Sequence, residues 1–329
     1  MITGPSSYDS TMTEFKQHWS SANTKLAPTP LILTLPDYKI SMSQAQFAAL
    51  QTSLLAQQDV VQTWAVDVQI ARGDLNVKKA ALLAKFNLFT SLLDASYLGT
   101  GFYEARPLAP GITFGKETFL KPLGDAMKLW KRMNEGVAPA GVTLPLKLGD
   151  GTEQGAFASE VSALCFAYAD MEGKEVDLRI ARGDRNVIQN KAYAAMKTYR
   201  EGAENKFALH PELIESLPRL TPLPGHTPER VNASAMFEAP NESKIVHDAS
   251  TDPMIARYEL RGNAGDEYIE DDAVVIASHE PGEPMEFVTA FALTQPGAKA
   301  AFKVFVVLTT GNEAGSAEMV VERPLALAA

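Results

Sequence analysis

The sequence contains a single cysteine, Cys165, among 329 residues. One cysteine cannot form a disulfide within the chain, and this fits a reducing compartment. No apolar run approaches the roughly 18 residues that a membrane-spanning helix needs, so we expect no membrane span. Residues 1–10 have neither a basic residue nor a following apolar core, so we expect no secretory signal. Together these absences favour the cytoplasm over non-classical export.

Sequence motifs of known catalytic chemistry are also missing. The five histidines stand in no His-Glu-x-x-His arrangement, and the chain has no Cys-x-x-Cys pair. No Gly-x-Ser-x-Gly elbow occurs, and the glycines at 99–101 are too few and too badly placed for a phosphate loop. We therefore expect no catalytic residue, cofactor site or metal site. Cys165 follows Leu164 on an apolar helix face, where we expect inert packing.

One group of carboxylates is a weak candidate for calcium. Five acidic residues fall within seven positions, but their spacing is not that of an EF-hand loop, and a solvated loop is the default interpretation. The five are Asp266, Glu267, Glu270, Asp271 and Asp272.

Negative charge is concentrated in the C-terminal part. The net charge is −10, and residues 229–329 hold 7 basic and 17 acidic residues, so residues 1–228 are balanced. An acidic surface repels phosphate backbones, so we expect no nucleic-acid partner. The acidic surface either serves solubility or docks a basic partner.

The chain contains an internal duplication. Residues 66–77 return as residues 176–187, with nine identities in twelve positions at an offset of 110. Phe47 and Leu54 match Phe157 and Leu164 at the same offset. Such a match indicates two related units, about residues 31–140 and 141–220. We do not recognise a family for this duplication.

Apolar residues at strict intervals of seven predict that each unit contains a long helix. Sustained sevens are typical of helices packed as in a left-handed coiled coil. Ser41 or Ser43 is a candidate N-cap, and Arg185 interrupts the pattern in the second unit. In the first unit the series is Phe47, Leu54, Val61, Val68, Leu75, Leu82 and Phe89.

Gly73 and Gly183 leave two alternatives open. Either each glycine ends a helix and an aspartate opens the next, or the helix continues and the glycine lies where another helix approaches closely. Apolar residues recur every seven positions on both sides of Gly73, which favours a continuous helix.

Shorter helices complete an elongated antiparallel bundle over residues 1–220. We expect helices at 8–22 and 116–134, because each carries apolar residues on one face. The extended segments 31–35 and 144–148 occupy equivalent places in the duplication and are candidates to pair with each other.

A different kind of domain follows a proline-rich linker at 221–228. In residues 229–325 the apolar period changes to two, and five to seven short strands predict an all-β sandwich. The fold class is therefore α+β and multidomain, a helical bundle followed by a sandwich.

The sandwich region resembles the fibronectin type III domain. Asp252-Pro253 with residues 258–260 is similar to the approach to the family's third strand. Pro296-Gly297, residues 302–304 and Gly315-Ser316 are similar to its sixth strand and the following turn. The resemblance covers residues 228–324, about 30% of the chain. It implies a rigid spacer or a protein-binding module.

Two positions depart from the family pattern. His247 stands where the family usually has its core tryptophan, and Ala300 stands where it has the tyrosine of its corner. We expect His247 to lie in the core or at an edge of the sandwich.

The tripeptide Arg-Gly-Asp occurs twice, at 72–74 and 182–184. Cell-surface receptors read this tripeptide on exposed turns, whereas both copies here lie inside helical pattern. We expect structural ion pairs from these arginines and aspartates, within or between helices.

These observations predict a non-enzymatic structural or interaction protein, a scaffold or assembly subunit that associates with itself or with another protein. A first alternative is a binding module for a host protein or a carbohydrate. It is disfavoured for sugars because Trp19, Trp64 and Trp130 all lie in the helical part. A second alternative is an enzyme with an unrecognised site.

Overall fold

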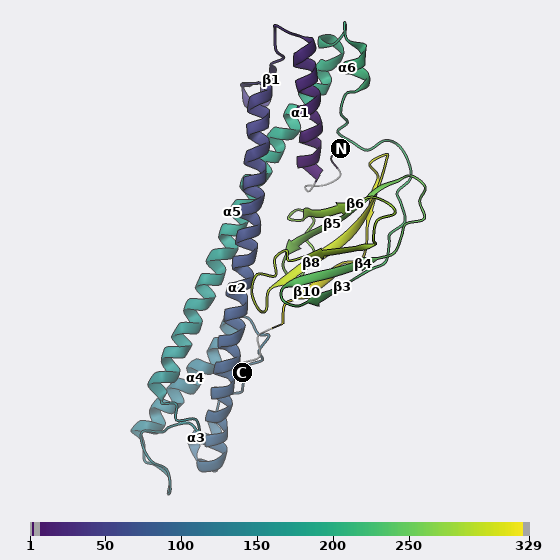
Figure 1. Ribbon diagram of the computed structural model, residues 1–329. Coiled ribbons are helices and arrows are strands. Elements are labelled where there is room, and N and C mark those ends of the chain that lie inside the picture. Colours follow the sequence, from purple (N-terminus) through teal and green to yellow (C-terminus); the bar gives the residue numbers. More distant parts are fainter. Residues whose placement is uncertain (1, 3–6, 325–329) are drawn as a thin grey trace. The chain divides into compact units, whose positions relative to one another are not determined.

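The computed structural model describes residue 2 and residues 7–324 (Figure 1). The chain divides into two compact units, Met1–Gln69 with Asp177–Ala329, and Ile70–Val176. The helical region contains α1 (Tyr8–Lys25), β1 (Leu33–Leu35), η2 (Pro36–Tyr38), β2 (Ile40–Met42), α2 (Gln44–Ser96), α3 (Gly101–Glu104), α4 (Lys116–Glu135), α5 (Gln154–Lys206) and α6 (Pro211–Glu215). Among the described residues, no helix combines the length and apolarity that crossing a bilayer requires.

The two long helices, α2 and α5, each have 53 residues without a break. Ser43 caps α2, because its hydroxyl accepts from the Gln46 backbone N–H at 3.3 Å while the Gln46 side chain accepts from the Ser43 N–H at 2.7 Å. Gly73 and Gly183 lie inside these helices, so the prediction of continuity is confirmed. The expected close approach of another helix at these glycines is wrong, since a methyl group on either glycine would meet no described atom within 4 Å.

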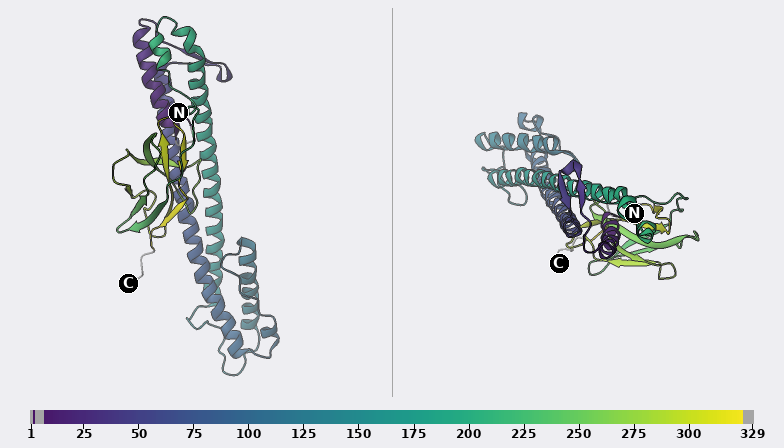
Figure 2. Two further views of the ribbon diagram at one scale, coloured as in Figure 1. Left: turned by 90° about the vertical axis from the view of Figure 1, so that its right-hand side faces the viewer. Right: turned by 90° about the horizontal axis from the view of Figure 1, so that it is seen from above.

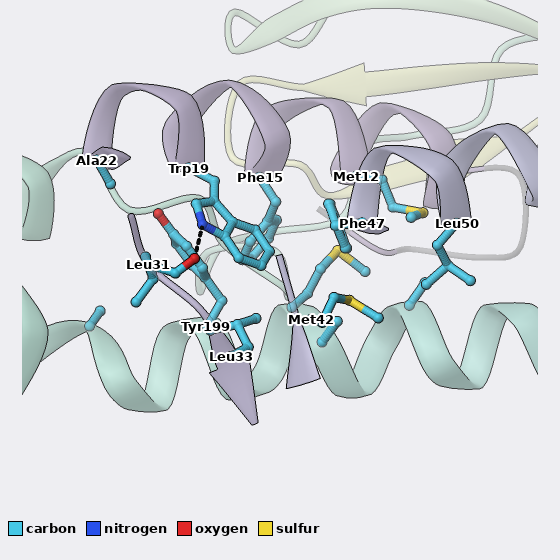
Figure 3. Close-up of a cluster of buried hydrophobic side chains, with 14 of the residues drawn as sticks. Met12, Phe15, Trp19, Ala22, Leu31, Leu33, Met42, Phe47, Leu50 and Tyr199 are labelled. Atoms are coloured by element: carbon cyan, nitrogen blue, oxygen red, sulfur yellow. Dashed lines mark hydrogen bonds between the residues drawn. The ribbon is translucent and has the colours of Figure 1, made fainter. Parts of the chain in front are cut away.

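The apolar residues spaced by seven along α2 form its buried face, as the sequence predicts. All seven residues from Phe47 to Phe89 in that series are buried. In the compact unit of residues 1–69 and 177–329, the beginning of α2 packs with α1 and the end of α5 around Trp19. The Trp19 Nε1 donates to the Leu31 carbonyl at 3.3 Å (Figure 3). The views of Figure 2 show α1 beside the first part of α2, where Gln51 bonds to Asp9 and Thr13.

The other compact unit, residues 70–176, repeats this construction with the opposite ends of α2 and α5. There the end of α2 packs with α4 and the beginning of α5, and Trp130 takes the place of Trp19. The Asn23 Oδ1 accepts from the Leu31 N–H at 2.9 Å, and the Asn134 Oδ1 accepts from the Leu146 N–H at 2.8 Å. Both tryptophans are fully buried.

The same glutamine contact also occurs in both units. The Gln44 side chain donates to the Lys16 carbonyl at 3.2 Å, and the Gln154 side chain donates to the Met127 carbonyl at 3.3 Å. The equivalent contacts carry the duplication back to α1 and α4. The similarity between the two halves therefore includes α1 and α4, in addition to the stretches from residues 31 and 141 that the sequence indicates.

The extended segments do not pair with each other, contrary to the sequence expectation. β1 pairs with β2 in a local antiparallel hairpin, with Leu33 opposite Met42. In the other unit, the segment at 144–148 contributes one isolated bridge, between Lys147 and Glu153. Each segment pairs with residues close to it in the sequence, because closing a short loop costs less conformational entropy than closing a long one.

The C-terminal region consists of antiparallel strands in two sheets. One sheet has the order β3-β4-β7, and the other has the order β10-β8-β5-β6 with β9 also paired to β8. Side chains from both sheets form one core. The strands are β3 (Ala233–Glu238), β4 (Glu242–His247), β5 (Ile255–Ala264), β6 (Val274–His279), β7 (Glu286–Thr289), β8 (Lys299–Leu308), β9 (Glu313–Gly315) and β10 (Met319–Glu322).

Candidate interaction surface

The five carboxylates considered for calcium do not act as one group. Asp272 is buried, and its carboxylate accepts from the Arg182 Nε at 2.9 and 3.0 Å and from the Arg185 Nη1 at 3.0 Å. Two guanidinium groups therefore occupy the oxygens that a cation would need. In the described part of the chain, no three His, Cys, Asp or Glu side chains are placed to hold a metal ion.

This ion pair joins the β-sandwich to the helices of its own unit. Two glutamines on α2, seven residues apart and hence on one face, add backbone contacts beside it. The Gln69 amide donates to the Lys299 carbonyl at 3.0 Å and accepts from the Lys299 N–H at 3.1 Å. The Gln62 amide donates to the Asp272 carbonyl at 2.6 Å and accepts from the Ala264 N–H at 3.4 Å. The Gln69 side chain thus imitates a neighbouring strand, and the Gln62 side chain bridges two segments of the sandwich.

Apolar contact accompanies these polar bonds. Val61, Ala65 and Val68 of α2 pack with Leu178 and Ala181 of α5 and with Ala264 at the end of β5. The junction therefore combines a small apolar cluster with directional bonds, and the directional bonds fix how the sandwich is seated on the helices.

The sequence did not identify the residues of this junction. A glutamine on a helix surface gives no signal of a partner more than 200 residues away. The one available signal was Arg185, which breaks the apolar series at the position where the first copy has Leu75. The break marks the place where the second copy binds the sandwich.

The arginines of the repeated tripeptide form ion pairs, but only the pair of Arg72 joins two helices as expected, and Arg182 pairs outside the helical region. Arg72 pairs with Glu175 on α5 at 3.3 Å, and Arg182 pairs with Asp272. The aspartates Asp74 and Asp184 are exposed. Both tripeptides lie inside a helix and not on a turn.

Cys165 is exposed, so the expectation of buried packing is wrong. Leu164 points into the core, and each helical step turns the next side chain by about 100°, which carries Cys165 out of the apolar face.

Two histidines, His18 and His247, take buried structural positions. The His18 Nδ1 lies 2.7 Å from the Tyr199 hydroxyl, and its Nε2 lies 2.8 Å from the Leu213 carbonyl. Burial lowers the pKa of His18 below its usual value, against the opposing effect of the Leu213 carbonyl. His247 is buried in the sandwich and packs against Tyr258. Its Nε2 lies 3.0 Å from that of His279, and burial lowers its pKa.

The most closely repeated segment presents its identities to the outside. Positions 66–77 and 176–187 share their buried positions, three in each copy, at 68, 71 and 75 and at 178, 181 and 185. Of these three, only Ala71 and Ala181 are identical. Eight of the nine remaining positions are identical, and the exception is Gln69, which binds the sandwich.

Identical apolar residues on this surface form one line along each helix. We call Ile70, Gly73 and Val77 the α2 stripe, and Ile180, Gly183 and Val187 the α5 stripe. Val77 and Val187 are 65% and 63% exposed, and Ile180 is 56% exposed. A packed interior normally restrains sequence more than an exposed face does. A face that stays alike while the interior changes points to a binding role.

No protein-family model matches the sequence, and no curated protein is significantly similar to it. Solved structures match over about 30% of the chain and fit its C-terminal β region. A fibronectin-like protein from Clostridium thermocellum is 19% identical, with 31% of this chain and 100% of that chain covered and a TM-score of 0.23. A fibronectin type III domain of human contactin 1 is 14% identical, with 33% and 87% covered and a TM-score of 0.26.

A pectate lyase from Erwinia chrysanthemi, PelI, solved with tetragalacturonic acid, is similar over the same share. It is 16% identical, the match covers 28% of each chain, and the TM-score is 0.24.

Proposed function

We propose that this chain is a non-enzymatic structural or interaction protein that binds protein partners, copies of itself included, through the α2 and α5 stripes. The observation that carries the proposal is the burial pattern of the duplicated segment, in which eight of the nine positions that are not buried are identical but only one of the three buried positions is. The exposed apolar identities among them, Gly73 with Gly183 and Val77 with Val187, are accounted for by a surface that binds.

The side chains on the stripes suit helix pairing. Burying a Val or Ile side chain from water stabilises a complex by about 1.5–3 kcal/mol before the costs of association. Gly73 and Gly183 leave open space at the centre of each stripe, which allows a partner backbone to come close. A glycine inside a helix costs about 1 kcal/mol, so its presence at both places calls for a gain elsewhere.

The remaining parts support the same role. We assign residues 229–325 to a fibronectin type III-like module and residues 1–220 to an elongated antiparallel bundle with coiled-coil packing, joined by residues 221–228. In this role the sandwich is a rigid attachment, because Gln62, Gln69 and Asp272 bind it to the helices.

Carbohydrate binding by the sandwich receives no support from its aromatic residues. Tyr258 and Tyr268 are buried, so neither presents a ring face to a sugar. The acidic surface remains unsuited to nucleic acid.

Light scattering after size-exclusion chromatography tests the proposal for self-association. Between about 1 and 100 µM, a rise in mass above 35.6 kDa is expected, and it should be stronger at 0.5 M salt, where repulsion between exposed carboxylates is screened. The variant with Ile180→Ser and Val187→Ser should stay monomeric, while Ser21→Asp, an exposed change on α1, should behave as the wild type. A wild-type chain that is monomeric throughout contradicts self-association.

A further inference from the structure

Two histidines meet end to end inside the β-sandwich. His247 is the last residue of β4 and His279 is the last residue of β6, and these strands belong to different sheets. Their Nε2 atoms are 3.0 Å apart, while the ring centres are 5.2 Å apart and the ring planes differ by 16°. Because the separation of the centres exceeds that of the nitrogens by about one ring width, the two Nε2 atoms point toward each other. The pair therefore joins the two sheets through one contact.

Both rings are held in the same way at their other nitrogen. The His247 Nδ1 lies 2.9 Å from the carbonyl oxygen of Asp248, and the His279 Nδ1 lies 3.2 Å from the carbonyl oxygen of Glu280. A carbonyl oxygen only accepts hydrogen bonds, so each Nδ1 has to carry a hydrogen. A neutral imidazole has one N–H, and its other nitrogen is an acceptor. If both rings were neutral, two lone pairs would face each other across 3.0 Å.

One additional proton removes this conflict. The two contacts to carbonyls and the contact between the rings need three N–H groups, whereas two neutral rings supply only two. One imidazolium and one neutral imidazole supply three, so every contact then has a donor and an acceptor. Two imidazolium rings would supply four and would place like charges side by side. The singly protonated pair is the state that satisfies the geometry.

Aromatic side chains enclose the contact. The ring centre of Tyr258 on β5 lies 4.6 Å from that of His247 and 5.1 Å from that of His279. The ring centre of Phe287 on β7 lies 5.6 and 4.7 Å from the same two centres. Both rings are buried, and the Tyr258 hydroxyl accepts from the Ser250 N–H at 2.6 Å. In such surroundings a hydrogen bond assisted by charge is about twice as strong as a neutral one.

The charged residues nearest to the pair on the neighbouring strands are bonded to each other. Glu286 of β7 pairs with Lys244 of β4 at 2.9 Å. Arg257 donates to Glu259 at 2.7 Å, and these two residues stand on either side of the buried tyrosine of β5, so their side chains lie on the opposite face of the sheet. On β6 itself, His279 is the one titratable residue. The proton balance therefore belongs to the two histidines and their immediate neighbours.

The surroundings also assign the donor. Burial lowers the pKa of His247, and a charge on His279 lowers it further, against the opposing effects of the Asp248 carbonyl and carboxylate. His247 is 5% exposed, whereas His279 is only partly buried. His279 is therefore the imidazolium that donates, and His247 accepts through a neutral Nε2.

A metal ion does not fit on the line between the two nitrogens. Zn–N bonds are about 2.0–2.1 Å long, so two of them in line need nitrogens about 4 Å apart. The observed separation is 3.0 Å, which suits a hydrogen bond between nitrogens.

We infer that His247 and His279 share one proton at neutral pH and so form a charged bridge between the two sheets of the sandwich, which a second proton breaks. The inference is independent of the proposed function. At about pH 5–6, where histidine clusters take up protons, two charged rings would repel each other. β6 is an edge strand, so the repulsion would release its end from the sandwich.

Nitrogen-15 NMR of the full-length protein, labelled at histidine, tests the shared proton. At pH 7.5 an unperturbed histidine, half-charged near pH 6.5, is about nine-tenths neutral. One ring of the pair should nevertheless carry hydrogens on both nitrogens, and the other on Nδ1 alone. In His247→Phe, which keeps an aromatic ring but removes the acceptor, His279 should carry a single hydrogen. His226→Gln, a change at an exposed histidine, should leave the signals of the pair unchanged. Two neutral rings in the wild type at pH 7.5 would overturn the inference.

The pH dependence of stability separates a shared proton from a neutral pair by its sign. With one proton held in the folded state, the stability that His279 adds over His279→Phe is fully present below about pH 6.5 and is lost as the pH rises toward 8. The loss should approach tenfold in the unfolding equilibrium constant per pH unit, since one proton is released. With two neutral rings, the same difference would grow as the pH rises. Urea titrations of both proteins between pH 6 and 8 decide between the two.

Two further measurements cover the remaining alternatives. The NMR signals of the pair should be the same with and without EDTA, and a change on adding the chelator would assign the bridge to a metal ion and overturn the shared proton. Hydrogen exchange, corrected for the intrinsic effect of pH, should show that residues 277–279 lose protection between pH 7 and pH 5 in the wild type but not in His247→Phe. Equal protection at both pH values in the wild type would overturn the release of β6.

Discussion

The Nη1 atom of Arg185 lies 3.0 Å from the Oδ1 of Asp272, and both side chains are almost fully buried. Arg185 occupies the position that Leu75 holds in the first copy of the duplication. One substitution in one copy thus converts a residue of the helix seam into an anchor for the sandwich. Both copies hold the C-terminal domain but with different side chains, the first with Gln62 and Gln69 and the second with arginines.

Asp272→Asn tests this anchor. The change leaves Arg185 buried beside a neutral amide, and breaking a buried ion pair from one side costs about 3–5 kcal/mol. We expect the free energy of unfolding from urea titration to fall by that order. Asp271→Asn, at the exposed neighbouring position, is the control and should change it by less than about 0.5 kcal/mol. Equal effects would show that Asp272 is not an anchor.

Gln69→Glu tests the imitation of a strand by a side chain. A carboxylate still accepts from the Lys299 N–H but cannot donate to the Lys299 carbonyl, which then loses its partner. We expect a loss of about 1–3 kcal/mol in the free energy of unfolding. Gln58→Glu, on the same helix without such a pair, is the matched control. The prediction is wrong if the two variants unfold alike.

Gly73→Ala and Gly183→Ala should each stabilise the isolated chain. Space is free around both positions, so the gain in helix propensity, about 1 kcal/mol, is not offset by a clash. Thermal unfolding measures it. The same substitutions should weaken self-association in light scattering, because a methyl group keeps a partner backbone away from the α2 or the α5 stripe. A variant that gains stability and keeps full self-association would remove the role given to the glycines.

Acidification should destabilise the unit that contains His18. Burial lowers the pKa of His18 and of His247, so the folded state holds these rings neutral while the unfolded chain takes up protons near pH 6.5. The unfolded state then binds more protons, and stability decreases as the pH falls from 7 toward 5. The double variant with His18→Gln and His247→Gln should show a flatter dependence. A slope unchanged from the wild type would contradict the assignment.

The sequence was most informative where a pattern repeats at short range. The sevens from Phe47 to Phe89 predicted the buried face of α2, because a helix converts spacing directly into direction. It was least informative about Gln62 and Gln69, whose partners are set by tertiary structure. The sequence showed that residues 66–77 are repeated at 176–187. It did not show which of the identical residues are exposed, because that depends on how the helices pack.

The correspondence between α1 and α4 was missed for a different reason. Trp19 and Trp130 are the only identical large aromatic residues between these two short helices, and their offset of 111 differs by one from that of the long helices. Their equivalence became evident from the hydrogen bonds of Asn23 and Asn134. Short amphipathic helices keep a pattern more than particular residues, so sequence comparison alone overlooks them.

The way the copies share their cores makes each copy depend on the other. The core around Trp19 contains Tyr199 and Phe207 from the second copy, and the core around Trp130 contains Phe86 and Phe89 from the first. A single copy supplies only part of each core, so neither copy can bury its apolar residues alone. A truncation that removes one copy would therefore expose apolar surface in both cores.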